Sequence, residues 1–130
     1  VVHCPVSNMR LGCGASPVVK LLKAGVNVAL GTDGAANACS LSMFEQMRTA
    51  GLIAKGFSQD PTQLTVNQII RMATINGANA LKLDREVGSL AVGKFADLAV
   101  IDMSQLVTMP VLDVLSNVIY AVEAQCIHQV

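Results

Sequence analysis

Apolar residues occur along the chain in short runs that are separated by polar and glycine-rich stretches. The first run ends at His3, because Pro5 has no N–H to donate and therefore stops a strand. The run at 26–30 has the length and the β-branched composition of a strand buried in a parallel sheet, and it ends at a glycine-rich loop around Asp33. We therefore expect two strands, each followed by polar residues at its carboxyl end.

The segment between these strands predicts a loop followed by a helix. Residues 7–16 contain the asparagine, serine and glycine typical of a loop, and Ser16 followed by Pro17 predicts a helix start. A strand, a helix and a second strand within about thirty residues form a βαβ unit, whose right-handed crossover makes the strands parallel. His3 and Asp33 are then expected beyond the same edge of the sheet.

Helical spacing of apolar residues follows this unit. Ser42 and Thr65 each have a glutamate or glutamine three residues later, which is the spacing of a capping box. We expect the first of these helices to continue to Gly56, the second to break near Gly77, and a short further helix at 78–81. The methionines with helical spacing are expected to fill the core rather than to face a cofactor: Met43, Met47 and Met72.

The pattern changes after residue 86 to turn glycines and a strand-like run, so we place a domain boundary between residues 1–86 and 87–130. Helical spacing returns after Pro110, and the last ten residues are strand-like in composition. Both ends of the chain fall in strand-like stretches, and the first residue is not methionine. We therefore expect these residues to be a piece of a longer polypeptide.

Composition narrows the function classes. Nine basic and nine acidic residues give zero net charge, and aromatic residues make up 3% of the chain, so no basic stripe or stacking platform for nucleic acid is expected. The longest purely apolar run, residues 118–122, is far shorter than the roughly 20 residues that cross a bilayer. Four widely spaced cysteines suit a reducing compartment, and we expect a cytoplasmic protein.

Asp33 is the strongest candidate for chemistry, because it follows an apolar strand and is flanked by small residues. Sites form at this edge of parallel sheets and barrels, although from the residues alone capping of the next helix or a tight turn is the slightly better explanation of an aspartate here. His3 ends the neighbouring strand and either donates to a ligand or is a structural histidine. A zinc site built from the cysteines and His3 is conceivable, but the cysteines lack paired spacing, so ordinary thiols are the better interpretation.

Three segments resemble the amidohydrolase superfamily, in particular its branch of 5-methylthioadenosine/S-adenosylhomocysteine deaminases and related chlorohydrolases. HCPVSNMRL at 3–11 and GVNVALGTDGAA at 25–36 are similar to that family's seventh and eighth barrel strands. The run at 88–102 is similar to its return from the barrel into a small β-sandwich. The resemblance covers almost the whole chain. It implies an α/β fold: the C-terminal part of a (β/α)8 metal-dependent hydrolase barrel plus the start of the β-sandwich domain.

The resemblance also implies a reaction. Family members hold a metal, usually zinc, that lowers the pKa of a water molecule. Asp33 matches the aspartate that binds the metal and accepts the water's proton, after which the hydroxide attacks a ring carbon that bears an amine. His3, Ser7 and Asn8 match the segment that lines the substrate pocket. Asn37, where many relatives have serine, is expected to contact the substrate.

The histidine pair, the two further histidines and the glutamate of the family's active site have no counterpart here, since the chain has two histidines in all. A catalytic zinc needs about three protein ligands. We expect the 130 residues alone to be inactive and to bind no metal, and the parent to deaminate an adenosine-like or other aminated heterocycle. The alternatives are a non-catalytic fragment that self-associates through unpaired strand edges, a dechlorinating or other C–N hydrolase, and an unrelated α/β binding module.

Overall fold

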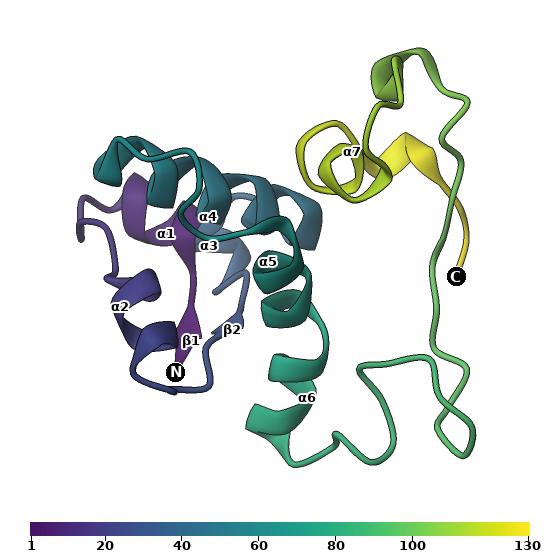
Figure 1. Ribbon diagram of the computed structural model, residues 1–130, viewed down its shortest axis with the longest axis horizontal. Coiled ribbons are helices and arrows are strands. Elements are labelled where there is room, and N and C mark those ends of the chain that lie inside the picture. The colour runs from purple at the N-terminus through teal and green to yellow at the C-terminus, as the bar shows by residue number, and fades with distance from the viewer.

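The computed structural model describes residues 1–130, which form two small sheets and seven α-helices (Figure 1). The elements follow in the order β1 (Val2–His3), α1 (Pro5–Arg10), α2 (Val18–Lys23), β2 (Ala29–Leu30), α3 (Ala35–Ala38), α4 (Met43–Ser58), α5 (Val66–Ala73), α6 (Ile75–Leu81), β3 (Val100–Ile101), α7 (Val114–Tyr120) and β4 (Ile127–Gln129), with 3₁₀ turns at Leu106–Thr108 and Ala124–Cys126.

β1 and β2 lie side by side and are parallel, with His3 opposite Leu30. Two further backbone bonds extend the ladder, from Ala29 N to Val1 O at 2.9 Å and from Gly31 N to His3 O at 3.0 Å. The predicted parallel βαβ unit is therefore confirmed, with α2 as its helix. The second strand is shorter than expected, since Val26 N bonds to Leu21 O in the preceding helix.

The expectation of a loop at residues 7–16 is wrong for its first part, because α1 occupies residues 5–10. Pro5 stands at the first helical position, where its fixed φ suits a helix and its missing N–H is not needed. The chain turns only at Gly12, which has a φ of +69°. The expected helix start at Ser16 is also displaced: Pro17 is the N-cap of α2, and no side chain caps this helix.

The two predicted caps downstream are present. Ser42 Oγ accepts Glu45 N at 3.3 Å, and α4 continues two residues beyond the expected end at Gly56. Thr65 forms a full capping box with Gln68. The break between α5 and α6 falls at Thr74 rather than at Gly77, because Thr74 leaves the helical conformation with φ −127° and ψ −99°.

The core lies where these helices cover the β1–β2 pair. Met47 and Met72 are buried in it and Met43 packs against it, so the core role predicted for the methionines is confirmed. The largest fully buried apolar side chains are Ile69, Met72 and Ile119. This core fixes the carboxyl ends of both strands relative to α4. Its buried members are Val18, Val28, Leu30, Met47, Ala50, Leu64, Ile69, Met72 and Ile119.

After α6 the chain forms loops and then an extended stretch along one side of the molecule, which leads to the 3₁₀ turn at Leu106–Thr108 (Figure 1). β3 and β4 form an antiparallel pair, and α7 returns to contact α4 and α5, with Ile119 in the core. Several apolar side chains of this part are exposed, among them Leu90, Val92 and Leu106. The boundary at 86/87 and the β-sandwich stay predictions. No helix has both the length and the apolar character that a membrane span requires.

Candidate functional site

Asp33 lies in an exposed loop three residues beyond β2, and its backbone is in the left-handed region with a φ of +58°. Residues other than glycine adopt this conformation uncommonly, asparagine and aspartate more often than most, and it recurs at turns and functional sites. The surrounding contacts must therefore hold the loop in place.

Three neutral donors hold the Asp33 carboxylate. Its Oδ2 accepts from Ser7 Oγ at 2.7 Å and from Asn37 Nδ2 at 3.2 Å, and its Oδ1 accepts from Gly34 N at 2.8 Å. The hydrogen bond from Ser7 lowers the pKa of Asp33 most, followed by those from Gly34 and Asn37. The carboxylate is thus ionised at neutral pH, and no hydrogen-bond partner carries a positive charge.

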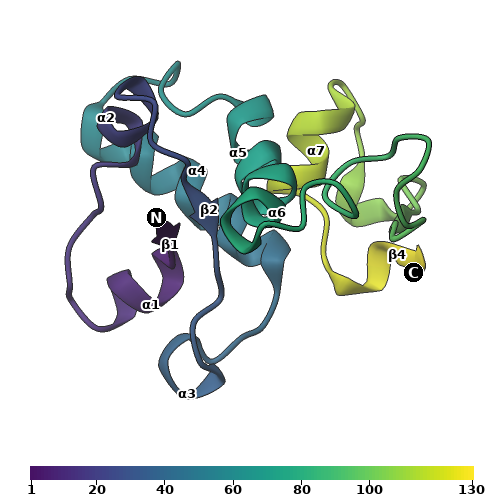
Figure 2. The same cartoon turned by 90° about the horizontal axis from the view of Figure 1, so that it is seen from below.

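The capping alternative for Asp33 is wrong for α3. Gly34 is the N-cap of that helix, and no side chain caps it. The hydrogen bond from Gly34 N to Asp33 Oδ1 lies within the loop, and Asp33 accepts no N–H from the first turn of α3. Asp33 instead joins the loop to α1, which lies beside α3 in the fold (Figure 2).

Three residues that the sequence analysis singled out lie together in the structure: Ser7 and Asn37 both contact Asp33. Ser7 is 2% exposed on α1, and Asn37 is half-buried on α3. Asn8 follows Ser7 on α1, where its carbonyl accepts Cys13 N at 2.9 Å; no hydrogen bond of its side chain is formed. The roles of these residues toward a substrate stay predictions.

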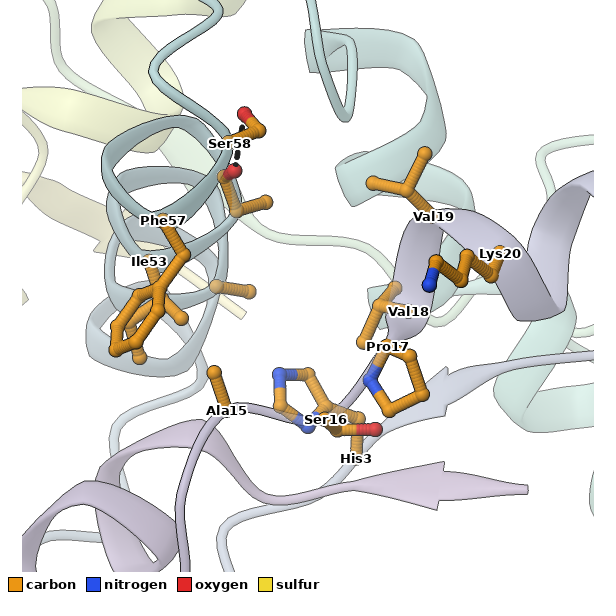
Figure 3. A pocket seen from close by; sticks show the side chains of 12 residues that line it. His3, Ala15, Ser16, Pro17, Val18, Val19, Lys20, Ile53, Phe57 and Ser58 are labelled. Carbon is orange, nitrogen blue, oxygen red and sulfur yellow. Dashed lines mark hydrogen bonds between the residues drawn. The ribbon is translucent and has the colours of Figure 1, made fainter.

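His3 lies apart from this group. Its side chain points into a cavity of about 270 Å³ between α2 and α4, among Pro17, Val18 and Phe57 (Figure 3). Neither Asp33 nor Ser7 lines that cavity. His3 is still a strand residue, so its side chain follows the alternation of β1 and faces the helices, whereas Asp33 lies beyond its strand.

The imidazole of His3 is buried and unpartnered. It is 4% exposed, and its Nδ1 has no hydrogen-bond partner. Burial lowers the pKa of His3, so the ring is neutral at pH 7. The expectation that His3 and Asp33 share one edge is therefore not met by their side chains.

The cysteine zinc site weighed from the sequence is not formed, because no group of three or more histidine, cysteine, aspartate or glutamate side chains lies together in the structure. Cys4 is the cysteine near Asp33. Burial and the negative charge of Asp33 raise the pKa of its thiol, which keeps it protonated at neutral pH. The residues present fit one carboxylate ligand, Asp33, rather than a complete metal site.

Two residues around this site were missed from the sequence. Arg10 donates from Nη1 to Ala36 O and Asn37 O, both at 2.9 Å, and Gln46 Oε1 accepts Val6 N at 3.3 Å. Gln46 was detectable: it is a polar residue on the same helix face as the apolar Met43, Met47 and Ala50. Arg10 had no such signal, since an exposed arginine at the end of a helix is common.

A sequence model of the amidohydrolase family matches residues 1–130. The chain is 51% identical over 121 residues to a 5-methylthioadenosine/S-adenosylhomocysteine deaminase of Moorella thermoacetica, covering 93% of this chain and 28% of that protein. It is 47% identical, with the same coverage, to a 5′-deoxyadenosine deaminase of Methanosarcina acetivorans.

Solved structures agree with the sequence relatives. An adenosine deaminase from Xanthomonas campestris with bound zinc superposes with a TM-score of 0.94 at 45% identity, over 98% of this chain and 29% of that one. A zinc complex of an atrazine chlorohydrolase from Arthrobacter aurescens superposes with a TM-score of 0.86 at 26% identity, over 97% of this chain and 28% of that one. The chain thus spans less than a third of these relatives.

Proposed function

The chain belongs to the amidohydrolase family, and from that premise we propose that it is the part of a metal-dependent deaminase that supplies the Asp33 carboxylate. The whole protein would release ammonia from an adenosine derivative by hydrolysis. The observation that carries this proposal is the environment of Asp33. Its carboxylate is exposed and ionised, its backbone has a positive φ, and three neutral donors orient it.

The proposed fold follows from the same premise. β1 and β2 would be adjacent strands of a (β/α)8 barrel, and residues 87–130 would begin a β-sandwich domain. Two observations support the barrel: the strands are parallel, and their connecting helix lies against the same core. In such barrels the chemistry takes place beyond the carboxyl ends of the strands, which is where Asp33 lies.

Asp33 is the one residue here that we propose as a ligand for zinc or another divalent metal. A metal bound there would lower the pKa of a water molecule to near neutrality. The remaining ligands would come from other parts of the whole protein, whose relatives are more than three times as long as this chain. Oδ1 of Asp33 accepts a single N–H, so this oxygen keeps room for a further partner.

In the proposed reaction, the residues of this chain would accept a proton and orient the groups that react. Asp33 would accept a proton from the attacking water, and its lowered pKa means that the carboxylate is ionised before the reaction. Ser7 and Asn37 would hold Oδ2 and leave Oδ1 facing the reaction. Asn8, beside Ser7 on α1, remains a proposed substrate contact.

Deamination of an adenosine derivative is favoured over dechlorination because this chain has higher sequence identity to adenosine-type deaminases than to the chlorohydrolase. The relatives named as adenosine-type deaminases are 45–51% identical to this chain, whereas the chlorohydrolase is 26% identical. Both a deaminase and a chlorohydrolase superpose on this chain, and each of these structures contains zinc, so the activity has to be measured. Self-association of the isolated 130 residues is a separate proposal, supported by the exposed strand residue Val2.

A substrate comparison tests the proposed function. The zinc-loaded whole protein would be assayed for ammonia released from 5′-deoxyadenosine and 5′-methylthioadenosine, and for chloride released from a chlorinated triazine. We expect ammonia release from the nucleosides with a kcat/KM at least about tenfold above chloride release, since a mismatched substrate loses specific contacts. Chloride release that equals or exceeds ammonia release would contradict deamination.

A further inference from the structure

α1 is a six-residue helix that side-chain hydrogen bonds join to three other parts of the fold: α4, the loop around Asp33 and α3. Helices this short are unstable by themselves, so their position depends on tertiary contacts. The middle contact is the bond from Ser7 to Asp33. The other two hold the ends of the helix, and both come from side chains outside the proposed chemistry.

The first end of α1 lacks a cap of its own. The side chain of Cys4 at the N-cap makes no capping bond, and Pro5 has no N–H. The first free N–H belongs to Val6, and Gln46 Oε1 accepts it at 3.3 Å. Gln46 is 0% exposed, and it stands on α4, the longest helix of the fold. The buried amide therefore fixes the start of α1, one residue before Ser7, to the core.

The second end of α1 is held by Arg10. Its guanidinium reaches the carbonyls of Ala36 and Asn37, both at 2.9 Å, and so joins α1 to α3 across 26 residues of sequence. α3 has only four residues, and Asn37 on it also donates to Asp33. Arg10 thus restrains α1 and the far side of the Asp33 loop with one side chain.

We propose that Gln46 and Arg10 are positioning residues that keep the Asp33 carboxylate oriented by fixing the two ends of α1. Neither side chain touches Asp33, so neither takes part in proton transfer. The inference rests on the proposed function. Loss of either contact would let α1 shift, and a shift of about 1 Å in a site costs on the order of 100-fold in rate.

Arg10→Met in the whole protein tests the proposal, with Arg71→Met as the matched control. Both arginines are exposed and lie in the last turn of a helix, but Arg71 makes no hydrogen bond to another element. The readouts are kcat and KM for ammonia release, the zinc retained after dialysis against a chelator, and the melting temperature.

We expect Arg10→Met to lower kcat and zinc affinity by about tenfold, the lower end of what residues behind a metal ligand contribute. KM should change by less than about twofold, since no substrate contact is lost. Arg10→Lys, which keeps one charged donor, should recover part of the loss. Arg71→Met should match the wild type. Gln46→Met should also lower kcat by about tenfold when kcat is calculated from the concentration of folded protein.

Equal kcat and equal zinc retention in Arg10→Met and Arg71→Met would overturn the positioning role, as would a lower melting temperature with unchanged kcat. A wild-type protein that releases no ammonia would overturn the proposed function instead. Zinc retention in the two arginine variants would then decide the positioning role on its own.

Discussion

The ends of β1 and β2 differ more than their sequences suggest. Each strand is two residues long; β1 ends with His3, and Asp33 lies three residues beyond β2. Asp33 is exposed, strained and held by three donors, whereas His3 is buried and its Nδ1 has none. A position near a strand end therefore does not define a site. Asp33 and His3 differ in the number of hydrogen-bond partners that orient their side chains.

The contrast is also one of charge. Hydrogen bonds lower the pKa of Asp33 and keep it charged at neutral pH, while burial lowers the pKa of His3 and keeps it neutral. An ionised carboxylate can bind a cation or accept a proton. A neutral imidazole in an apolar cavity acts first as a packing group. Four substitutions in the whole protein can break or sharpen this contrast.

Asp33→Asn should have the largest effect. The amide is nearly isosteric but carries no charge, so it accepts no proton and binds a divalent metal weakly. We expect kcat/KM for ammonia release to fall by at least about 1,000-fold, which corresponds to about 4 kcal/mol of transition-state stabilisation. Steady-state kinetics with 5′-deoxyadenosine checks this. Activity within tenfold of the wild type would remove Asp33 from the chemistry.

Ser7→Ala should come next. It removes the shortest bond to the Asp33 carboxylate, 2.7 Å long, and leaves the loop with two donors. We expect kcat to fall by about 10–100-fold, the range typical of residues that orient a metal ligand. Ser89→Ala, at an exposed serine without a hydrogen bond, is the control. If both variants kept wild-type kcat, Ser7 would be a packing residue only.

Asn37→Ala should have a smaller effect. Its bond to Asp33 is 3.2 Å long, and neutral hydrogen bonds contribute about 0.5–1.5 kcal/mol. We expect kcat to fall by at most about tenfold. The same assay separates the two roles open to Asn37: a rise in KM with unchanged kcat would show contact with the substrate, and a fall in kcat with unchanged KM would show orientation of Asp33.

His3→Leu should change activity least. We expect KM and kcat within about twofold of the wild type, since the side chain faces the cavity between α2 and α4. An unfolded chain protonates this histidine near its ordinary pKa of 6.5, but the folded protein resists protonation. Stability from this group is therefore complete above pH 6.5 and lost as the pH falls below it.

Thermal unfolding between pH 7.5 and 5 checks the second half of this prediction. The wild type should lose more stability over this range than His3→Leu does. At pH 7 the variant should be as stable as the wild type or more stable by up to about 1 kcal/mol, because an unpartnered buried nitrogen is removed. A rise in KM above about tenfold would instead support the substrate contact predicted for His3 from the sequence.

The sequence predicted what depends on local rules. The cap at Thr65 and the buried methionines follow from spacing within a few residues, and the parallel strands follow from a strand, helix and strand within about thirty residues. The role of Asp33 stays a prediction. Helix α1 was missed because its six residues are too few to show a helical period. Only the proline at its start indicated it.

The remainder depends on contacts between residues far apart in the chain. Ser7 and Asp33 are 26 residues apart, and Val6 and Gln46 are 40 apart, so no local pattern contains either pair. The direction of His3 was unpredictable for another reason. A strand of two residues gives no alternation from which to read which face is buried.

The distance between the metal and Asp33 tests the central claim most directly. A crystal structure of the zinc-loaded whole protein, with anomalous data collected at the zinc edge, would locate the metal without reference to activity. We predict a zinc ion about 2.0–2.2 Å from a carboxylate oxygen of Asp33, the range for zinc bound to aspartate. A zinc ion bound elsewhere, with Asp33 contacting only Ser7, Gly34 and Asn37, would contradict the account.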